Sequence, residues 1–266
     1  MKTATVLLGF VLATVSAVAS PPAGGWQALA NYRAADALKI FDGVRTAADP
    51  ALEREARFGR GVALLDLQPV TGGQLDEARR IFSELADTGA DDPAQGARFF
   101  LGRIAQHHQP QPDAAEAARQ FRRLISEHED SRWAQAALSR LALLQIYELE
   151  PAVTPAARLT EAGKLLAHAR TPSAESELHY TIANAIFFYR LPAAGALPHL
   201  LAAERLGQLD WPTRVEVLVQ IAELSRLAGD RAQAAKFYRT FLTENPRDLR
   251  VYIIREHLAE VEKPVP

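Results

Sequence analysis

Clusters of proline, glycine and acidic residues interrupt the chain at short intervals, and this punctuation constrains the fold more than any other feature. The clusters include "AADPA", "TGADDP", "QPQPDA", "EHEDS", "ELEPAVTP", "RTPS", "RLPAAG", "LDWP", "LAGD" and "ENPRD". Each contains residues that end a helix, cap the start of the next helix, or do both. The segments between the clusters must therefore be short, separate elements of secondary structure.

These segments carry the spacing of apolar residues that is typical of helices. Phe121, Leu124 and Ile125, for example, share one face of a helix because their spacing matches the helical period. Residues with β-branched side chains are sparse, and after the first residues no long stretch alternates between apolar and polar side chains. The sequence therefore predicts an all-α protein of roughly a dozen helices joined by mostly short loops.

The segment "RLAGDRAQAAKFYRTFLTENP", residues 226–246, shows the pattern most clearly. It predicts the end of one helix, a break at Gly229 and Asp230, and an amphipathic helix that ends at Asn245 and Pro246. Small residues and aromatic residues recur on this second helix at helical spacing. The segment therefore predicts the turn and second helix of a helix pair.

A unit from Val215 to Asp248 adds the first helix of this pair. We expect the small residues Ala222 and Ala234 to let the two helices approach closely, and larger side chains such as Tyr238 to fill the space toward the next pair. These residues and their spacing resemble the tetratricopeptide repeat, a helix–turn–helix unit of about 34 residues. One such pair cannot bury its apolar stripe alone, so neighbouring pairs must stack.

Earlier parts of the chain repeat the same order of small and larger apolar residues, with longer loops. The repeated sets are Ala37, Phe41 and Val44; Gly61, Ala78, Phe82 and Leu85; Gly102, Ala117, Phe121 and Leu124; Ser139, Ala142, Ala162, Leu166 and Ala169; and Ala183, Ala196, Leu200 and Ala203. A final helix in "LRVYIIREHLAEVEK" would close the stack, with Tyr252, Ile253 and Ile254 on one side and charged residues elsewhere.

The resemblance implies an α-solenoid, a right-handed superhelix of stacked antiparallel helix pairs, over residues 20–262. This domain would contain about five helix pairs, an N-terminal helix and a C-terminal capping helix, followed by a short tail, residues 263–266. The segment "AARQFRRLISEHEDSRWAQAALSRLALLQ" is also similar to periplasmic tetratricopeptide proteins of bacterial envelopes, whose second helix ends in Tyr-Pro-Asp-Ser. Here His128 and Glu129 stand in place of Tyr-Pro.

The first 19 residues have the form of a secretory signal peptide. Lys2 precedes an apolar run, residues 4–18, and Ala17 and Ala19 form a small–x–small cleavage pattern that would leave Ser20 as the first residue. A retained membrane anchor is the alternative, although the run is shorter than the roughly 20 residues needed to span a bilayer. We therefore expect a periplasmic or secreted protein that is not stably inserted in the membrane.

Composition excludes several classes of function. The chain has no cysteine, which excludes disulfides, thiolate metal sites, cysteine nucleophiles and the acylated cysteine of bacterial lipoproteins. Basic and acidic residues nearly cancel, with a net charge of −2, whereas a nucleic-acid-binding protein needs a concentrated basic surface. We therefore expect no nucleic-acid partner.

No motif in the sequence predicts catalysis. His107 and His108 are adjacent, so on a helix they point about 100° apart and cannot readily chelate one metal ion. His257 and Glu260 lack the rest of a zinc-binding helix motif, and we expect them on the exposed face of the last helix. Carboxylates gather at helix boundaries, where capping explains them. No phosphate-binding loop or nucleophile elbow is present. We predict no enzyme activity, no cofactor and no metal.

The resemblance implies instead a partner-binding groove lined by the first helix of each pair. Its candidate lining residues are Arg103, His107, Arg140, Glu177, Tyr180, Asn184, Glu223 and Arg226. Phe99, Trp133 and Phe187 occupy similar positions, but we expect these three to fill the core between helices. The family's clamp for a C-terminal carboxylate needs lysine and asparagine in set places, and only Asn184 matches, so that ligand is not predicted.

The sequence thus favours an exported scaffold or adaptor that binds a peptide or protein partner in the bacterial envelope. The alternative is an enzyme or accessory that processes cell-wall glycan on a helical toroid. In that case, carboxylates should converge inside a closed ring, as a glycosidase needs a carboxylate pair across a cleft.

Overall fold

The computed structural model describes residues 21–44, 49–149 and 152–264, and the predicted signal peptide lies outside these residues. The described residues form thirteen α-helices, a π-helical turn and two 3₁₀ turns, and they contain no strand. The α-helices are α1 (Pro21–Ala30), α2 (Ala34–Gly43), α3 (Pro50–Asp66), α4 (Gly72–Asp87), α5 (Asp92–Arg103), α6 (Ala114–Glu127), α7 (Arg132–Tyr147), α8 (Pro155–Gly163), α9 (Pro172–Phe188), α10 (Ala196–Leu206), α11 (Trp211–Leu227), α12 (Arg231–Glu244) and α13 (Val251–Glu262). The predicted all-α fold is therefore confirmed.

The clusters that interrupt the sequence are helix caps in the structure. At nine helix starts, a side-chain oxygen accepts a hydrogen bond from a backbone N–H of the first turn, as in an N-cap. The capping residues are Asp49, Thr71, Asp91, Asp113, Ser131, Thr154, Thr171, Asp210 and Asp230. Proline follows several of these caps at the first or second helical position, where its missing N–H costs nothing.

The helices form two compact units, and the boundary between them lies within α4, at Ala78 and Arg79. In the first unit, α1, α2 and α3 pack around Phe41. A Cβ atom added at Gly25 or Gly59 would lie within 2.5 Å of the Phe41 ring. The lack of a side chain at both glycines therefore leaves room for this ring between the helices. Trp26 completes the cluster with an edge contact to Phe41, with ring centroids 5.3 Å apart.

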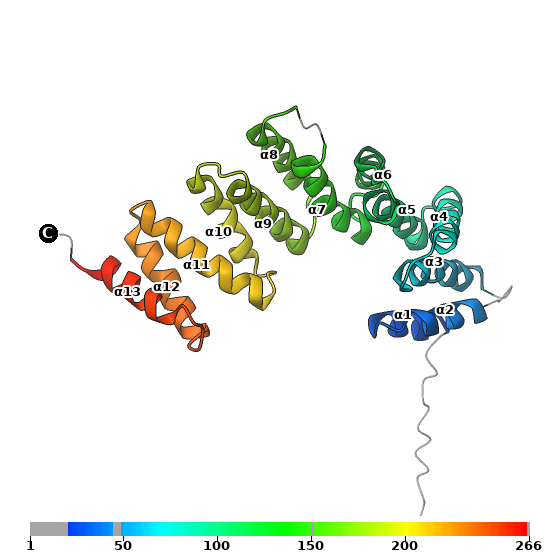
Figure 1. Ribbon diagram of the computed structural model, residues 1–266, viewed down its shortest axis with the longest axis horizontal. Helices are drawn as coiled ribbons and strands as arrows, with labels where there is room; N and C mark the ends of the chain where they lie inside the picture. Colours follow the sequence, from blue (N-terminus) through cyan, green and yellow to red (C-terminus); the bar gives the residue numbers. More distant parts are fainter. Residues whose placement is uncertain (1–20, 45–48, 150–151, 265–266) are drawn as a thin grey trace, which may run out of the picture. The chain divides into compact units, whose positions relative to one another are not determined.

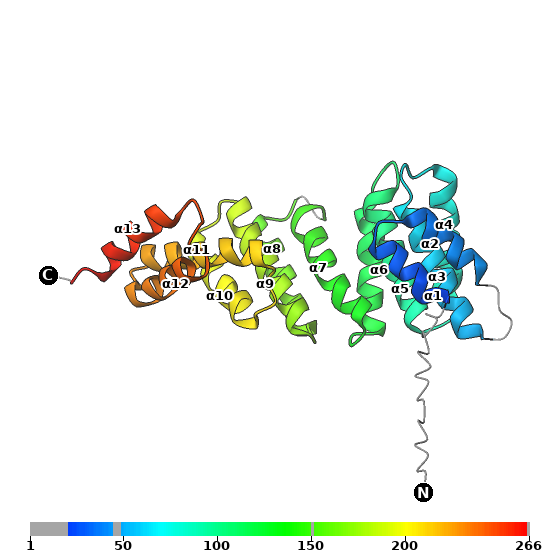
Figure 2. The same ribbon diagram turned by 90° about the horizontal axis from the view of Figure 1, so that it is seen from below.

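In the second unit, each helix packs against its neighbours in the sequence. The contacts run from α5 through α6 to α7, from α7 directly and through α8 to α9, and then through α10, α11 and α12 to α13 (Figures 1 and 2). One continuous hydrophobic core extends through this stack, from Phe99 to Val261. Nearest-neighbour packing with a shared core is the defining property of a helical-repeat solenoid.

The small residues predicted at the helix contacts are buried, as close packing requires. Ala117, Ala142, Ala183, Ala222 and Ala234 are all completely inaccessible to solvent. Their size lets the two helices of a pair approach, and the larger buried residues fill the space toward the next pair. The small residues that recur in the sequence therefore lie where the helices pack against each other.

The second helix of the α7–α8 pair differs from the prediction. The α-helix ends at Gly163 and continues as a 3₁₀ turn, η2 (Lys164–His168). A 3₁₀ turn has about three residues per turn instead of 3.6. The change of register buries Leu165 and leaves Leu166 only half-buried at the edge of the core.

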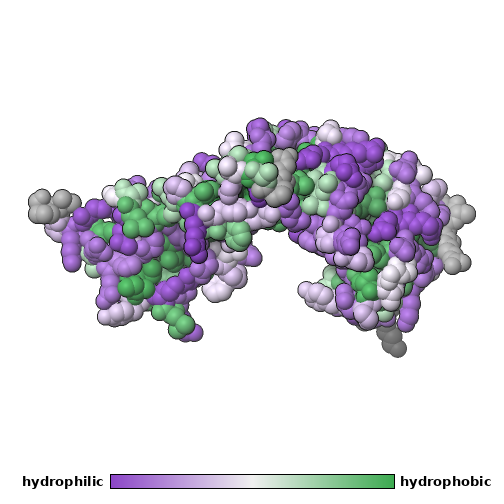
Figure 3. All heavy atoms as spheres, turned by 45° about the horizontal axis from the view of Figure 1, so that its top comes forward, coloured by the Kyte–Doolittle hydropathy of each residue, from purple (hydrophilic) through white to green (hydrophobic). Residues whose placement is uncertain are grey.

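The last helix also corrects a prediction, because Tyr252, Ile253 and Ile254 do not share one side. Ile254 is buried, whereas Tyr252 is 74% and Ile253 43% exposed. Consecutive residues of a helix diverge by about 100°, so three in a row cannot all face the core. Ile254 and Val261, two turns apart, form the buried stripe instead. Figure 3 shows hydrophobic surface among polar side chains on this C-terminal part of the chain.

None of the described helices combines the length and the apolar character that a membrane crossing demands.

Candidate partner-binding surfaces

Three of the predicted groove residues form a basic cluster on two successive first helices. Arg103 ends α5, His107 lies on the π-helical turn η1 (Ile104–His108), and Arg140 lies on α7. Partial burial, followed by the positive charges of Arg103 and Arg140, lowers the pKa of His107. The structure therefore brings together a histidine and two arginines that are up to one helix pair apart in the sequence.

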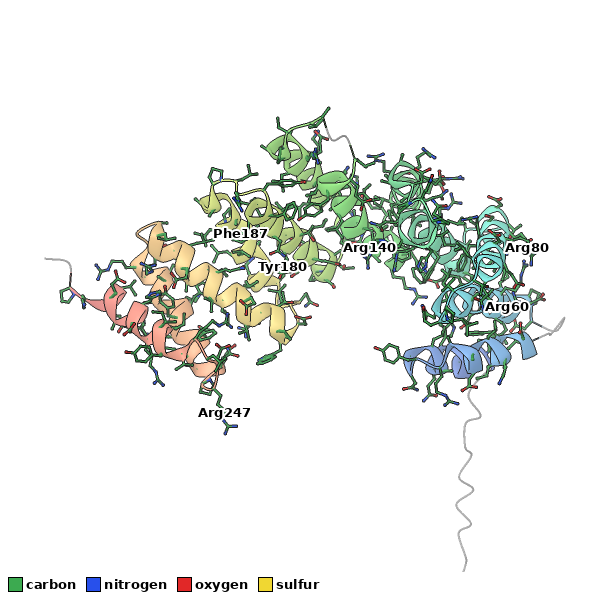
Figure 4. The ribbon with its side chains drawn as sticks, viewed as in Figure 1. Arg60, Arg80, Arg140, Tyr180, Phe187 and Arg247 are labelled. Atoms are coloured by element: carbon green, nitrogen blue, oxygen red, sulfur yellow. The ribbon has the colours of Figure 1, made fainter. Side chains whose placement is uncertain are left out.

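Three further predicted residues share one face of α9. Glu177, Tyr180 and Asn184 are three and four residues apart, which places them on neighbouring turns. Glu177 is exposed, and Tyr180 and Asn184 are half-buried. Figure 4 shows Tyr180 on α9 and Arg140 on the neighbouring α7. This face therefore presents a carboxylate, a phenol and an amide next to α7, the helix that carries Arg140 of the basic cluster.

The three aromatic residues at similar positions belong to the core, as predicted. Phe99 is buried, and Trp133 and Phe187 are half-buried against the same cluster. The Phe99 and Trp133 rings lie 5.5 Å apart, and the indole N–H of Trp133 donates a hydrogen bond to Asp92 at 3.0 Å. These aromatic side chains therefore hold α5 to α7.

The last two predicted groove residues, Glu223 and Arg226, take part in a network that joins three helices. Glu223 on α11 accepts a hydrogen bond from the Tyr238 hydroxyl on α12 at 2.7 Å. The same carboxylate lies 2.5 Å from Nδ1 of His257 on α13 and 3.0 Å from the Arg226 guanidinium. His257 is therefore half-buried against α11, and its predicted place on an exposed face was wrong.

Burial and hydrogen bonding act in opposite directions on the Glu223 carboxyl. Burial alone would raise its pKa, but hydrogen bonds from Tyr238, His257 and Arg226 lower the pKa overall. Burial, followed by the hydrogen bond to this carboxylate, raises the pKa of Tyr238. The Glu223 carboxylate is thus held ionised at neutral pH, and its main role in the structure is to connect α11, α12 and α13.

A histidine pair that the sequence analysis missed lies between α9 and α10. Nδ1 of His179 is 2.9 Å from Nδ1 of His199, and the ring centroids are 5.1 Å apart. Burial lowers the pKa of both histidines. The negative charge of Glu175 raises the pKa of His179, and the positive charge of Arg205 lowers it. His179 in turn lowers the pKa of His199. No spacing rule links residues on these two helices, so this pair could not be predicted from the sequence.

The pair makes stability depend on pH. A histidine whose pKa is lower in the folded chain binds protons more readily when the chain is unfolded. Its contribution to the free energy of unfolding is therefore fully present above about pH 6.5, the ordinary pKa of histidine, and is lost as the pH falls below that value. We expect the melting temperature of the wild type to fall more between about pH 7.5 and 5.5 than that of His199→Gln. Thermal unfolding followed by circular dichroism checks this. An equal fall in both proteins would contradict it.

A pocket of about 810 Å³ lies between the second helices α10 and α12. None of the predicted groove residues lines it. The prediction considered only the first helix of each pair, whereas most of the lining lies on the second helices, with only His179 and Arg214 on first helices. The described residues contain no group of three or more histidine and carboxylate side chains that could hold a metal ion.

Comparison with known proteins agrees with this architecture. Residues 216–248 match the family described as the tetratricopeptide repeat. The match covers most of α11 and all of α12 and ends just before α13. No curated protein matched the chain in a sequence search. Tetratricopeptide repeats are protein–protein interaction modules.

Proposed function

We propose that this chain, a tetratricopeptide-like helical-repeat protein, is an exported scaffold that binds a protein or peptide partner in the bacterial envelope. The repeat match at residues 216–248 carries the proposal, because this repeat generally binds proteins or peptides. The stack of helices from α5 to α13 extends the same packing beyond the matched unit. A rigid stack presents its exposed residues in a fixed arrangement, which suits recognition of another chain.

The first helices supply the proposed contact surface. The basic cluster of Arg103, His107 and Arg140 suits carboxylates of a partner, since arginine forms bidentate bonds with them. Tyr180 and Asn184 on α9 add a phenol and an amide that can pair with peptide groups. These polar groups are half-buried, so they must meet water or a partner.

The proposed activity is binding without catalysis. Two carboxylates of the kind that a glycosidase would use, Asp91 and Asp113, accept hydrogen bonds from backbone N–H groups at helix starts. Glu223 is engaged with Tyr238 and His257. These contacts support structural roles for the carboxylates. The rival function, processing of cell-wall glycan, would be favoured if the purified protein released soluble fragments from peptidoglycan.

Export is proposed from the first 19 residues. Cleavage after Ala19 would release a chain that begins at Ser20. Mass spectrometry of the protein recovered from the periplasm or the medium tests this, and a mature N-terminus at Ser20 is the expected result. A full-length chain that stays with the membrane fraction would support the anchor instead.

The binding surface is tested by three substitutions on the first helices. We expect Arg103→Ala/Arg140→Ala/Asn184→Ala to lose a partner that the wild-type chain from Ser20 captures from envelope extract, with affinity reduced at least about 10-fold. The matched control, Arg80→Ala/Arg122→Ala/Gln208→Ala, removes two arginines and an amide from exposed positions elsewhere. Affinity is measured with the purified partner by calorimetry.

Both triple variants must first give the wild-type circular dichroism spectrum. A partner that binds the first-helix variant as tightly as the wild type would place the contact on another surface. Failure of the wild-type chain to capture any partner would contradict the proposed scaffold function. It would favour the rival function, processing of cell-wall glycan.

A further inference from the structure

The pocket between α10 and α12 is built mainly from one face of each of these helices, and His179 of α9 and Arg214 of α11 complete its lining. Its lining extends from Pro198 to Arg205 on α10 and from Gln233 to Thr240 on α12. On α10 the lining residues Leu201 and Ala202 follow Pro198 by three and four positions, and on α12 Lys236 and Phe237 follow Gln233 in the same way, so each set forms a stripe along its helix. Each stripe covers about two helical turns, or roughly 10 Å.

The position of α11 keeps this pocket open. Both α10 and α12 pack against α11, and the pocket volume of about 810 Å³ lies between their facing stripes. The result is a groove with a helix on each side, on the second helices of the stack. It is separate from the surface of the first helices on which the proposed function rests.

The floor of the groove is apolar. Phe237 on α12 is buried, and Leu201 and Ala202 on α10 are half-buried. A partner that places apolar side chains here would remove this surface from water, at about 25 cal/mol per Å² of apolar area. The floor therefore favours an occupant with an apolar stripe of its own.

The walls of the groove carry an excess of positive charge. Arg205 on α10 and Lys236 on α12 are exposed on opposite walls, and neither has a carboxylate partner among the described residues. The Lys236 ammonium lies 5.3 Å from the centre of the Phe237 ring. The one carboxylate of the lining, Glu204, is already paired with Arg214 at 2.8 Å. Two unneutralised cations thus flank an apolar floor.

We propose that this groove binds an acidic amphipathic peptide segment of a partner protein. An amphipathic helix laid along the groove would place apolar residues on Phe237 and Leu201, as other helix-in-groove complexes do. Carboxylates on both sides of its apolar stripe would then meet Arg205 and Lys236. Charge complementarity selects this occupant, because a basic peptide would be repelled by the same two side chains.

The test uses a fluorescein-labelled model peptide of about 16 residues, with leucines at helical spacing and glutamates beside them. A scrambled peptide of the same composition and a peptide with lysine in place of glutamate are the comparison probes. Fluorescence anisotropy with the chain from Ser20 measures the dissociation constants. We expect the acidic amphipathic peptide to bind at least about 10-fold more tightly than either comparison peptide.

Charge reversal locates the site. We expect Arg205→Glu/Lys236→Glu to weaken binding of the acidic peptide at least about 10-fold, since each substitution replaces an attraction by a repulsion. The matched control Arg122→Glu/Arg247→Glu changes the net charge equally at exposed positions outside the groove. It should stay within about 2-fold of the wild type. All variants are tested for unchanged circular dichroism.

Three results would overturn the proposal. Wild-type protein that does not bind the acidic peptide would exclude the occupant, and equal binding of the scrambled peptide would show attraction by charge alone. Equal weakening by the control variant would place the effect on net charge instead of on the groove. Arg103→Ala/Arg140→Ala/Asn184→Ala should bind the peptide like the wild type, so this test and the test of the proposed function can fail separately.

Discussion

Gly102→Ala is expected to lower the free energy of unfolding by about 1–3 kcal/mol. A Cβ atom at this position would lie 2.5 Å from Cε1 of Phe121. The Phe121 ring is completely buried and cannot move toward solvent to relieve the overlap. In an open helix the same substitution would stabilise by about 1 kcal/mol, since alanine has the higher helix propensity. We expect Gly102→Ala to be destabilising because the overlap with Phe121 outweighs the gain in helix propensity.

Gly163→Ala is the matched control for this prediction. Gly163 is helical, and a Cβ atom added there would meet no other atom within 4 Å. We expect this variant to equal or exceed the wild type in stability. Equilibrium unfolding in urea, followed by far-UV circular dichroism, measures both variants. A stabilising Gly102→Ala would show that the contact of α5 with α6 is looser than the structure has it.

A smaller ring partner should rescue the overpacked variant. Phe121→Leu alone creates a cavity and destabilises, but in the background of Gly102→Ala the smaller side chain leaves room for the added methyl group. We expect the double variant to be more stable than the sum of the two single effects predicts, by about 0.5–3 kcal/mol. Additive effects would indicate that the two residues do not compete for the same space.

Glu223→Ala is expected to release α13 from the stack. The substitution leaves the buried Tyr238 hydroxyl without its acceptor and removes the partner of His257. An unsatisfied buried polar group costs about 1–3 kcal/mol, which corresponds to a loss of about 5- to 150-fold in protection of α13 amides. Hydrogen exchange with mass spectrometry of peptides from residues 251–262 measures the change directly.

Two further variants separate the causes of this effect. Glu223→Gln keeps an oxygen that can accept from Tyr238 but removes the charge that faces His257 and Arg226, so an intermediate loss is expected. Glu260→Ala removes an exposed carboxylate on α13, 3.8 Å from Arg226, and should change protection little. Unchanged exchange of α13 in Glu223→Ala would show that Ile254 and Val261 hold this helix without the network.

Much of the fold could be predicted because helix boundaries and close contacts depend on local residue type. The caps at Asp91 and Asp230 could be identified from residues a few positions apart, and so could the buried alanines. The 3₁₀ turn at Lys164–His168 could not, since it depends on how α8 meets its neighbours. This is why the predicted core position Leu166 is replaced by Leu165.

The candidate sites were harder to predict because their residues come from different helices. Glu223 and His257 are 34 residues apart, which is one repeat length, and so are Glu216 and Arg250. Equivalent positions of successive repeats are neighbours, so the repeat length itself contained the signal for both contacts. The pocket between α10 and α12 has no such signal, because the separation of two helices depends on the side chains packed between them.

Nearest-neighbour packing from α5 to α13 also determines how this part of the chain would respond to a pulling force. The main contacts of each described helix are with helices close to it in sequence, so we expect stretching to distribute small rotations over many interfaces. Small sliding movements between packed helices are one of the ways in which proteins change shape. We therefore expect the stack, although rigid without load, to lengthen under force by small changes at several helix contacts before any one helix pair separates.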